Sequence, residues 1–364
     1  MISRSLFLAL VIFCGTAEAA PSYAYRVEKS CTGVEHCYAS VQAALNAAGT
    51  ETGWVTIKLG AGDFYEKVNI TRPKTTLKGE GVGRTRLYFD AVAQTAGKYH
   101  RANWGTPGSA TLTIDADEVK VEALTVENTF DYLSNDALPD NDPKKIGNSQ
   151  AAALLLDIHS DRVSIRDAAL LGYQDTLFAN GARAFIDKSL IAGNVDFIFG
   201  NGQLLIQDSE LRTRKRGAKM AAGETQSFLL APSTQLSQAI GIVVYRSRLT
   251  RDDGVPDNTI ALARPWHPTS HFPDGRYADP NAVGYASFID CFMDAHIKSQ
   301  HWDVMAGTAR DGTKTAIFRP EDSRFAESGS TGPGARHTDQ AIRWKSPLSI
   351  QEVRALLFKD WPQP

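Results

Sequence analysis

Two aspartates near the middle of the chain, Asp175 and Asp196, have the residue type and the spacing for carboxylate chemistry. They belong to the stretches Gly172-Tyr-Gln-Asp-Thr-Leu and Gly193-Asn-Val-Asp-Phe-Ile-Phe-Gly200, and both stretches carry aromatic residues beside the aspartate. Two carboxyl groups held close together cannot both ionise easily, so one of them favours the protonated form. Such a pair would supply a nucleophile and a general acid from a single residue type.

An internal repeat places the two aspartates at the same point of consecutive units. Ten-residue segments beginning at Val163, Ala184 and Leu204 have Ile at the third position, a small residue at the sixth and an aliphatic residue at the eighth. Units this short are typical of an all-β solenoid whose stacked coils share one core. Each aspartate follows its Ile, Ile165 or Ile186, by the same interval. Because stacked parallel strands lie ~4.8 Å apart, we expect the carboxyl groups at roughly 5 Å.

An aspartate near a glycine often does no chemistry and accepts hydrogen bonds from its own loop. For a single aspartate we would favour that interpretation. For two aspartates in the same phase of a repeat, each flanked by aromatic residues, we favour catalysis.

Composition narrows the class of protein. The 364 residues, 43% of them apolar, are enough for one long domain, and a solenoid favours one. A net charge of −2 gives no global attraction to nucleic acid or membranes. No internal apolar run could span a bilayer, and the eight histidines lack metal-ligand spacing. We therefore expect no metal, cofactor, nucleic-acid partner or membrane partner, and we expect a monomer.

The N-terminus indicates export. Arg4, an apolar run over 6–13 and Ala17-Glu-Ala19-Ala20 are typical of a signal peptide over residues 1–20, leaving a single domain over 21–364. We expect secretion to the extracellular space, through the periplasm in a Gram-negative host. Cys31 and Cys37 bracket a short loop and are predicted to form a disulfide. Cys291 occupies the small sixth position of another repeat segment, so we expect a buried thiol.

Helices are expected only near the two ends. Residues 40–48 form a helix with Ser40 as its N-cap, which would cover the open end of the solenoid. A second helix is predicted to start at Ser346-Pro347 and to run over 348–358. The long loops 127–149 and 264–281 are expected to wall a groove on one side. The basic run 212–219 is either a solvated turn, which we favour, or a contact for a polyanion.

Several longer motifs resemble those of the pectin methylesterases, or pectinesterases. They are Gly-Asp-Phe-Tyr-Glu-Lys-Val at 62–68, Leu-Lys-Gly-Glu-Gly at 77–81, the two aspartate stretches, and Ala-Arg-Pro-Trp-His at 263–267. The resemblance covers nearly all of the chain after the signal peptide, and the motifs occur in the same order. It implies a right-handed parallel β-helix and hydrolysis of the C6 methyl ester of polygalacturonate (pectin), with release of methanol.

The resemblance also assigns roles to residues. Asp196 corresponds to the nucleophile, Asp175 to the general acid and then base, and Arg264 to the arginine that pairs with the nucleophile. The amides of Gln150 and Gln174 would donate hydrogen bonds to the oxyanion. The implied substrate-binding residues are Thr111, Phe178, Val195, Phe199, Trp266, Thr269 and Met305.

The sequence departs from the bacterial members of this family at two places. Phe178 stands where they have Tyr, and Ser189 and Ser209 stand where several have a disulfide. Two other interpretations of the solenoid stay open. A polygalacturonase-like glycosidase would also suit close carboxylates, although its signatures are absent here. A non-catalytic solenoid could bind cell-wall polysaccharide through Trp266. A calcium-dependent pectate lyase would need an acidic cluster that the sequence lacks.

Overall fold

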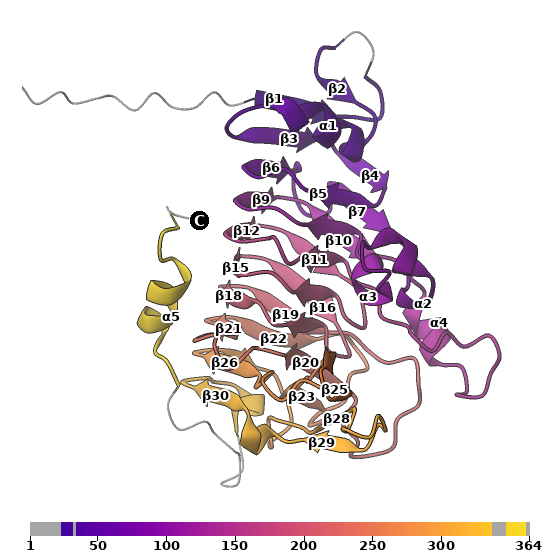
Figure 1. Ribbon diagram of the computed structural model, residues 1–364, viewed down its shortest axis with the longest axis vertical. Helices are drawn as coiled ribbons and strands as arrows, with labels where there is room; N and C mark the ends of the chain where they lie inside the picture. The colour runs from indigo at the N-terminus through magenta and orange to yellow at the C-terminus, as the bar shows by residue number, and fades with distance from the viewer. Residues whose placement is uncertain (1–22, 32–33, 337–346, 362–364) are drawn as a thin grey trace, which may run out of the picture.

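The computed structural model describes residues 23–31, 34–336 and 347–361, and Figure 1 shows a stack of coils along one long axis. The predicted signal peptide lies outside the described residues. Three parallel sheets form the walls of the stack, and between Val55 and Ala263 each coil contributes a strand to each sheet in turn. This arrangement confirms the predicted parallel β-helix. The described residues also contain no helix that is long and apolar enough to cross a membrane.

The strands occur in the following spatial order. The first sheet contains β2 (Cys37–Tyr38), β1 (Tyr23–Val27), β3 (Val55–Leu59), β6 (Thr75–Lys78), β9 (Val119–Glu122), β12 (Val163–Arg166), β15 (Arg183–Asp187), β18 (Gln203–Gln207), β21 (Ile242–Tyr245), β26 (Tyr285–Ile289) and β30 (Arg324–Ser328). The second contains β27 (Phe292–Met293), β22 (Arg248–Arg251), β19 (Glu210–Thr213), β16 (Leu190–Gly193), β13 (Ala169–Leu171), β10 (Thr125–Asn128), β7 (Thr85–Phe89) and β4 (Gly62–Tyr65). The third contains β23 (Ile260–Ala263), β20 (Ser227–Pro232), β17 (Ile198–Gly200), β14 (Leu177–Ala179), β11 (Leu154–Leu156), β8 (Leu112–Ile114) and β5 (Val68–Ile70).

The repeat found in the sequence corresponds to columns of stacked side chains. Ile165 in β12 pairs with Ile186 in β15, which pairs with Ile206 in β18, and all three are fully buried. Each ten-residue segment holds two strands, and a residue with positive φ turns the chain between them, as at Asp167 (49°) and Lys188 (48°). The segments are therefore corners of the coil.

A ladder of serines occupies the small sixth position at these corners. The hydroxyl of Ser189 accepts the N–H of Ala168 at 3.2 Å, and the hydroxyl of Ser209 accepts the N–H of Ser189 at 3.1 Å. Ser247 does the same for the N–H of Ser209 at 3.1 Å. Cys291 continues the column, and it is a buried free thiol as predicted. The serine hydroxyl groups thus link neighbouring coils at this corner.

A short helix covers the first end of the stack. In α1 (Val41–Ala47) the side chain of Ser40 accepts the N–H of Ala43, and the Glu66 carboxylate accepts the N–H groups of Val41 and Gln42 at 2.8 Å each. The buried residues of α1 pack on the first coil, beside β1 and β3 (Figure 1). The predicted capping helix is confirmed. Short 3₁₀ turns follow at η1 (Ala48–Thr50) and, near the other end, at η3 (Pro320–Asp322) and η4 (Pro333–Ala335).

The C-terminal helix α5 (Ile350–Leu357) lies along the outside of the stack, next to the first sheet (Figure 1). Its buried residues Val353 and Leu357 join a hydrophobic cluster with outward-facing residues of β15, β18, β21 and β26. The predicted start at Ser346-Pro347 is wrong by three residues. Ser349 is the N-cap and forms a capping box with Glu352, which satisfies the first N–H groups better than the proline start would.

The remaining elements belong to loops between the second and third sheets or beyond the third. Between β7 and β8 lie α2 (Ala93–Ala96), η2 (Gly97–Tyr99) and α3 (Gly105–Gly108), and α4 (Tyr132–Asp136) follows β10. Two antiparallel hairpins follow the third sheet: β24 (Thr269–Phe272) with β25 (Gly275–Ala278), and β28 (Met305–Gly307) with β29 (Ala316–Phe318).

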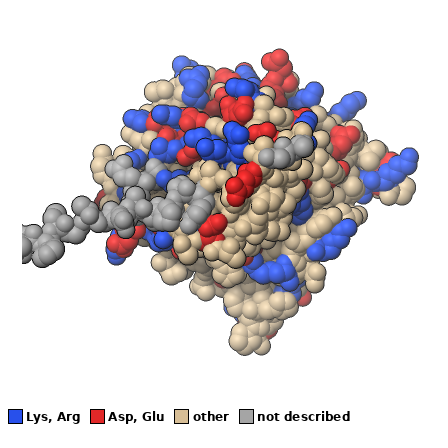
Figure 2. All heavy atoms as spheres, turned by 90° about the horizontal axis from the view of Figure 1, so that it is seen from above, with Lys and Arg blue, Asp and Glu red and all other residues tan. Residues whose placement is uncertain are grey.

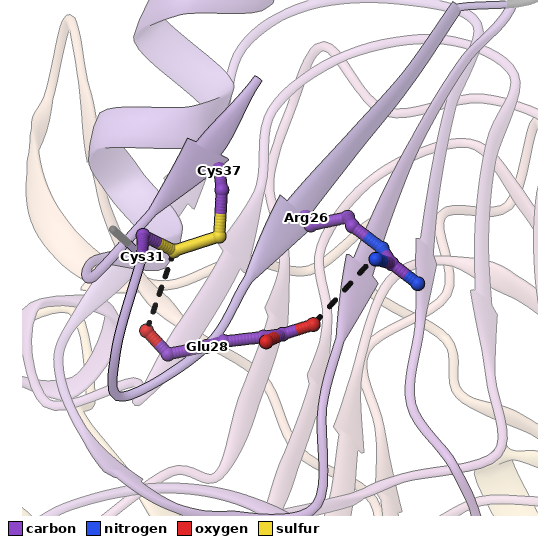
Figure 3. Close-up of a disulfide and its surroundings, with 4 residues drawn as sticks. All are labelled: Arg26, Glu28, Cys31 and Cys37. Atoms are coloured by element: carbon purple, nitrogen blue, oxygen red, sulfur yellow. Dashed lines mark hydrogen bonds and ion pairs between the residues drawn. A yellow bond between two sulfur atoms is a disulfide. The ribbon is translucent and has the colours of Figure 1, made fainter. Parts of the chain in front are cut away.

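Cys31 and Cys37 form a disulfide beside β1 (Figure 3). The bridge lies close to the exposed ion pair between Arg26 and Glu28 (Figure 3). Viewed from above in Figure 2, basic and acidic side chains are interspersed, as the small net charge leads one to expect.

Candidate active site

Asp175 and Asp196 occupy equivalent positions in consecutive coils, as the repeat predicts. Leu177 of β14 pairs with Ile198 of β17. Asp175 lies two residues before Leu177, and Asp196 lies two residues before Ile198. The backbone N–H of Asp175 donates to the carbonyl oxygen of Val195 at 3.1 Å. Both aspartates have positive φ, 64° and 50°, a left-handed conformation that Asp tolerates better than most residues. The same turn thus presents a carboxyl group in each of two stacked coils.

Arg264 directly follows β23 and donates two hydrogen bonds to the Asp196 carboxylate, one to each oxygen. Its Nε donates to Oδ1 at 2.8 Å and its Nη2 donates to Oδ2 at 2.6 Å. The guanidinium also lies 3.8 Å from the ring centroid of Phe228. Burial disfavours the charged guanidinium, but the adjacent charge of Asp196 outweighs it and raises the pKa of Arg264. Paired donors of this kind favour an ionised and oriented carboxylate.

Asp175 has the opposite environment. Its side chain is only slightly exposed, and burial together with the negative charge of Asp196 raises its pKa well above the usual value, against a smaller opposing effect of Arg264. The pair therefore contains one carboxylate held by an arginine and one carboxyl group that favours its proton. This is the division of acid and nucleophile expected of two close carboxyl groups.

The two aspartates open into a cleft of about 350 Å³. Gln150 and Gln174 line it, and the Oε1 of Gln174 accepts a hydrogen bond from the hydroxyl of Ser149 at 3.0 Å. Within the described chain, neither glutamine donates its side-chain N–H groups to another residue. Two amide donors therefore face a cavity that also contains the carboxyl groups. The described residues hold no group of three or more His, Cys, Asp or Glu that could bind a metal ion.

Three aromatic rings, those of Trp104, Phe199 and Trp266, line the cleft, and the buried ring of Phe178 packs beneath them. Phe199 stacks on Phe178 with ring centroids 4.2 Å apart. Trp266 meets Phe199 edge-on at 5.6 Å, and Trp104 meets Phe178 edge-on at 5.5 Å. Such a lining offers flat apolar surface beside the charged groups, which suits a ligand with both apolar faces and polar edges.

Comparison with known proteins assigns the chain to a family. The pectinesterase family model matches residues 30–359. The chain belongs to the pectinesterase family. It is 39% identical to pectinesterase A of Dickeya chrysanthemi over 363 residues, covering 99% of this chain and 98% of that protein.

Solved structures agree with this assignment. A pectin methylesterase from Erwinia chrysanthemi is 37% identical with a TM-score of 0.85, covering 94% of this chain and 99% of that one. A pectin methylesterase from Yersinia enterocolitica is also 37% identical, with a TM-score of 0.80, covering 89% and 99%. The right-handed parallel β-helix implied by the resemblance is therefore confirmed.

The other residues that the resemblance assigned to substrate binding lie at different places in the structure. Phe199, Trp266 and Met305 line the cleft. Thr269 lines an adjoining groove of about 710 Å³, where its hydroxyl lies 2.7 Å from that of Thr308. Val195 is partly exposed directly before Asp196.

Two of these residues do not line the cleft in the structure. Thr111 is fully buried, and its hydroxyl donates to the carbonyl oxygen of Glu127 at 2.9 Å inside the coil. Phe178 is also fully buried because Phe199 covers its ring. Phe178 therefore supports the cleft floor and presents no surface to a ligand.

One wall of the cleft was not predicted from the sequence. Trp104 and Thr106, in the segment with α2 and α3, face Trp266 and Met305 across the cavity. The available signal was Trp104-Gly-Thr-Pro-Gly108 in a long interval between two predicted strands. An exposed tryptophan in such a turn-rich stretch is a candidate ligand contact.

Both long loops, 127–149 and 264–281, were predicted to wall the groove, but the prediction is correct only for loop 264–281. Loop 264–281 supplies Arg264 and Trp266. The middle of loop 127–149 instead packs on the basic run, where the Asp136 carboxylate accepts from Arg216 at 2.8 Å and from the N–H of Gly217 at 2.8 Å. In the same run, the guanidinium of Arg214 lies 3.9 Å from the ring centroid of Tyr173, next to Gln174. This part of the basic run therefore packs against residues next to the cleft, and the prediction of a solvated turn is wrong for it.

Proposed function

We propose that Asp196 is the nucleophile and Asp175 the general acid and base with which this chain hydrolyses the C6 methyl esters of pectin. Membership of the pectinesterase family supports the reaction itself. The observation that carries the assignment of roles is the forked Arg264–Asp196 pair beside a buried Asp175 of raised pKa. A related pectin methylesterase, 37% identical, has been crystallised with a hexasaccharide, which supports a polysaccharide ligand for this cleft.

In the first step, a carboxylate oxygen of Asp196 forms a bond to the ester carbonyl carbon, and the carbonyl oxygen becomes negatively charged. The amides of Gln150 and Gln174 donate hydrogen bonds to that oxygen, which lowers the barrier. Methoxide is a poor leaving group, so the Asp175 carboxyl group gives its proton to the methoxy oxygen as the carbon–oxygen bond breaks. Methanol leaves, and an anhydride joins Asp196 to the C6 carbon.

In the second step, Asp175 is ionised and takes a proton from a water molecule. That water attacks the C6 carbon of the anhydride, and Asp196 leaves as a carboxylate, which Arg264 again holds. The products are a free galacturonate carboxyl group and the regenerated pair. Asp175 finishes with the proton that it needs for the next cycle.

We further propose that the sugar rings lie against the aromatic lining. Phe199 and Trp266 would contact the apolar faces of the sugars, with Trp104, Val195, Met305 and Thr269 around them. The exposed part of Trp104, 41% of the residue, is available for such a contact. Pectin is an extracellular polymer, so we propose secretion directed by residues 1–20, and action as a monomer.

A single assay tests the reaction class. The purified protein is incubated with highly methylated pectin, and methanol, reducing ends and unsaturated products are measured together. We expect methanol alone. Reducing ends would indicate a glycosidase and unsaturated ends a lyase, and binding without any product that survives loss of both aspartates would indicate a non-catalytic binder.

A further inference from the structure

Ser149, at the end of loop 127–149, contacts the side-chain amide of Gln174. The hydroxyl of Ser149 donates a hydrogen bond to Oε1 of Gln174 at 3.0 Å, and both residues are partly buried. Gln174 lines the cleft together with Asp175 and Asp196, whereas Ser149 is not one of the described residues that line it. The hydroxyl of Ser149 therefore reaches the cleft only through the glutamine.

This contact occupies the acceptor end of the amide. A glutamine side chain has an oxygen that accepts hydrogen bonds and an NH₂ group that donates two. Because the hydroxyl of Ser149 lies at Oε1 of Gln174, the Nε2 group is the end that remains for the cleft. In the part of the chain that the structure describes, no residue accepts a hydrogen bond from this Nε2 group. Its N–H groups are therefore available to a ligand oxygen.

The charge in the cleft favours this orientation of the amide. A hydroxyl can also accept a hydrogen bond, so Ser149 alone would tolerate Gln174 turned end for end. In that orientation the amide oxygen would face the cleft that holds the ionised Asp196, and like partial charges repel. Arg264 keeps the negative charge of Asp196 in place by donating to both of its oxygens. The NH₂ group is therefore the end that faces the carboxylate.

The backbone on both sides of Ser149 is fixed by hydrogen bonds. On one side, the carbonyl oxygen of Gln150 accepts the N–H of Ala93 at 2.9 Å. On the other side, the carbonyl oxygen of Asn148 accepts the N–H of Gln94 at 3.1 Å. The side-chain oxygen of Gln94 also accepts the N–H of Asn148 at 3.3 Å. The hydroxyl of Ser149 is thus presented from a fixed position.

The backbone of Gln174 is also fixed. Its carbonyl oxygen accepts the N–H of Ala151 at 3.2 Å. The carbonyl oxygen of Tyr173, the residue before it, accepts the N–H of Asn194 from the next coil at 2.9 Å. The side-chain torsions of Gln174 are then the freedom that remains, and the hydrogen bond from Ser149 restricts them.

We propose that Ser149 is a positioning residue for ester hydrolysis, which holds the amide of Gln174 so that Nε2 donates to the ester carbonyl oxygen as that oxygen becomes negative. This proposal rests on the proposed function, in which Gln174 donates to the oxyanion. A hydrogen bond accepted at Oε1 also polarises the amide, so its N–H groups become stronger donors. The contribution of Ser149 grows as negative charge develops, and it therefore acts on kcat more than on KM.

The test compares Ser149→Ala with Ser149→Thr by steady-state release of methanol from methylated pectin. Ser149→Ala loses one neutral hydrogen bond, so kcat should fall about 2–10-fold with KM nearly unchanged. Ser149→Thr keeps the hydroxyl and should retain the wild-type kcat. The matched control is Ser299→Ala, because the hydroxyl of Ser299 also donates to a glutamine oxygen, that of Gln300 at 3.5 Å, but at an exposed position outside the cleft. The control should retain wild-type kinetics, and thermal unfolding verifies the fold of each variant.

A double-mutant cycle tests whether the hydroxyl acts through the glutamine. Gln174→Ala should lower kcat about 10²–10³-fold, as expected for loss of an oxyanion donor. Ser149→Ala should then cause no further loss in the Gln174→Ala background. Unchanged kcat in Ser149→Ala alone, or an equal loss in both backgrounds, would overturn the proposal. A loss in Ser149→Thr as large as that in Ser149→Ala would overturn it as well.

Failure of the proposed function gives a different result. No release of methanol by the wild-type protein would refute the reaction itself. Unchanged kcat in Gln174→Ala would refute the role of Gln174, and this proposal with it. A loss in Gln174→Ala without any loss in Ser149→Ala would refute only the positioning role of Ser149.

Discussion

Arg264 binds both carboxylate oxygens of Asp196, whereas Asp175, one coil away, is buried next to the resulting ion pair. The arginine comes from β23, two strands beyond β17 in the third sheet, so it reaches back over an intervening coil. Two identical residue types thus have different surroundings: Asp196 accepts two hydrogen bonds from an arginine, whereas burial and the charge of Asp196 raise the pKa of Asp175. The first three predictions below depend on this difference.

The two aspartates should not be interchangeable. Asp196→Asn removes the nucleophile, so turnover of pectin should fall to background. Asp175→Asn removes only proton transfer, which typically contributes ~10²–10⁴-fold. Its activity should recover partly on an ester with a better leaving group than methanol, which needs less proton assistance. Initial rates on methyl and activated esters check this, and recovery by Asp196→Asn alone would mean that the roles are reversed.

Arg264→Lys should reduce kcat even though the charge is kept. A lysine cannot reproduce the fork to Oδ1 and Oδ2, and loss of one charge-assisted hydrogen bond corresponds to roughly 10–100-fold in rate. A suitable control is Arg212→Lys, because Arg212 pairs with Glu210 on the exposed second sheet. Equal kcat for Arg264→Lys and the wild type would show that the fork does not assist attack.

Asp175→Asn should stabilise the protein at neutral pH. The folded-state pKa of Asp175 is raised, so the unfolded chain releases this proton at a lower pH than the folded chain does. The stability due to protonated Asp175 is complete below the ordinary value of 3.8 and is lost as pH rises through the folded pKa. Denaturant unfolding should therefore show a more stable variant at pH 7 and a smaller difference near pH 4. A variant less stable at both would contradict a burial-dominated shift.

Trp104→Ala should raise KM more than it lowers kcat. The ring is 41% exposed at the cleft wall, so its removal leaves the buried core intact. An aromatic contact of 0.5–1.5 kcal/mol corresponds to about 2–10-fold in affinity. Steady-state kinetics on pectin give both constants, and Trp54→Ala, which lies near Lys120 away from the cleft, is the control. A selective fall in kcat would place Trp104 among the groups that orient the ester.

Cys291 should be unreactive in the native protein. It is fully buried, and burial raises the pKa of its thiol to about 12, so almost no thiolate forms at neutral pH. In exported protein lacking residues 1–20, an alkylating reagent should modify one thiol per chain only after denaturation, because Cys31 and Cys37 are bonded. Mass spectrometry counts the modified thiols, and three after denaturation without a reductant would exclude the disulfide.

The aspartate pair could be predicted because parallel stacking preserves register from coil to coil. Once Ile165 and Ile186 are placed in one column, every residue at the same interval after them must also stack. That geometry requires no knowledge of side-chain packing. The capping helix α1 was predictable for a different reason, because Ser40 and the helix-forming residues after it give a local signal.

Features outside the repeat were less predictable. The segment 93–108 has no period, so neither its path over the third sheet nor the position of Trp104 follows from the sequence pattern. The burial of Thr111 could not be predicted, because its hydroxyl turns inward and donates to the carbonyl oxygen of Glu127. The burial of Phe178 could not be predicted either, because it depends on the ring of Phe199 in the next coil.

The position of α5 has a consequence for how cooperatively the stack of coils unfolds. The helix follows every strand of the stack in the chain, yet Val353, Leu357 and Trp361 pack on the earlier strands β15, β18, β21 and β26. Each coil of a solenoid otherwise contacts only its neighbours and can detach from an end. Because α5 packs on several coils from outside, these coils should unfold together in one cooperative step. Removal of residues from 349 onward should therefore accelerate unfolding while leaving the geometry of the cleft unchanged.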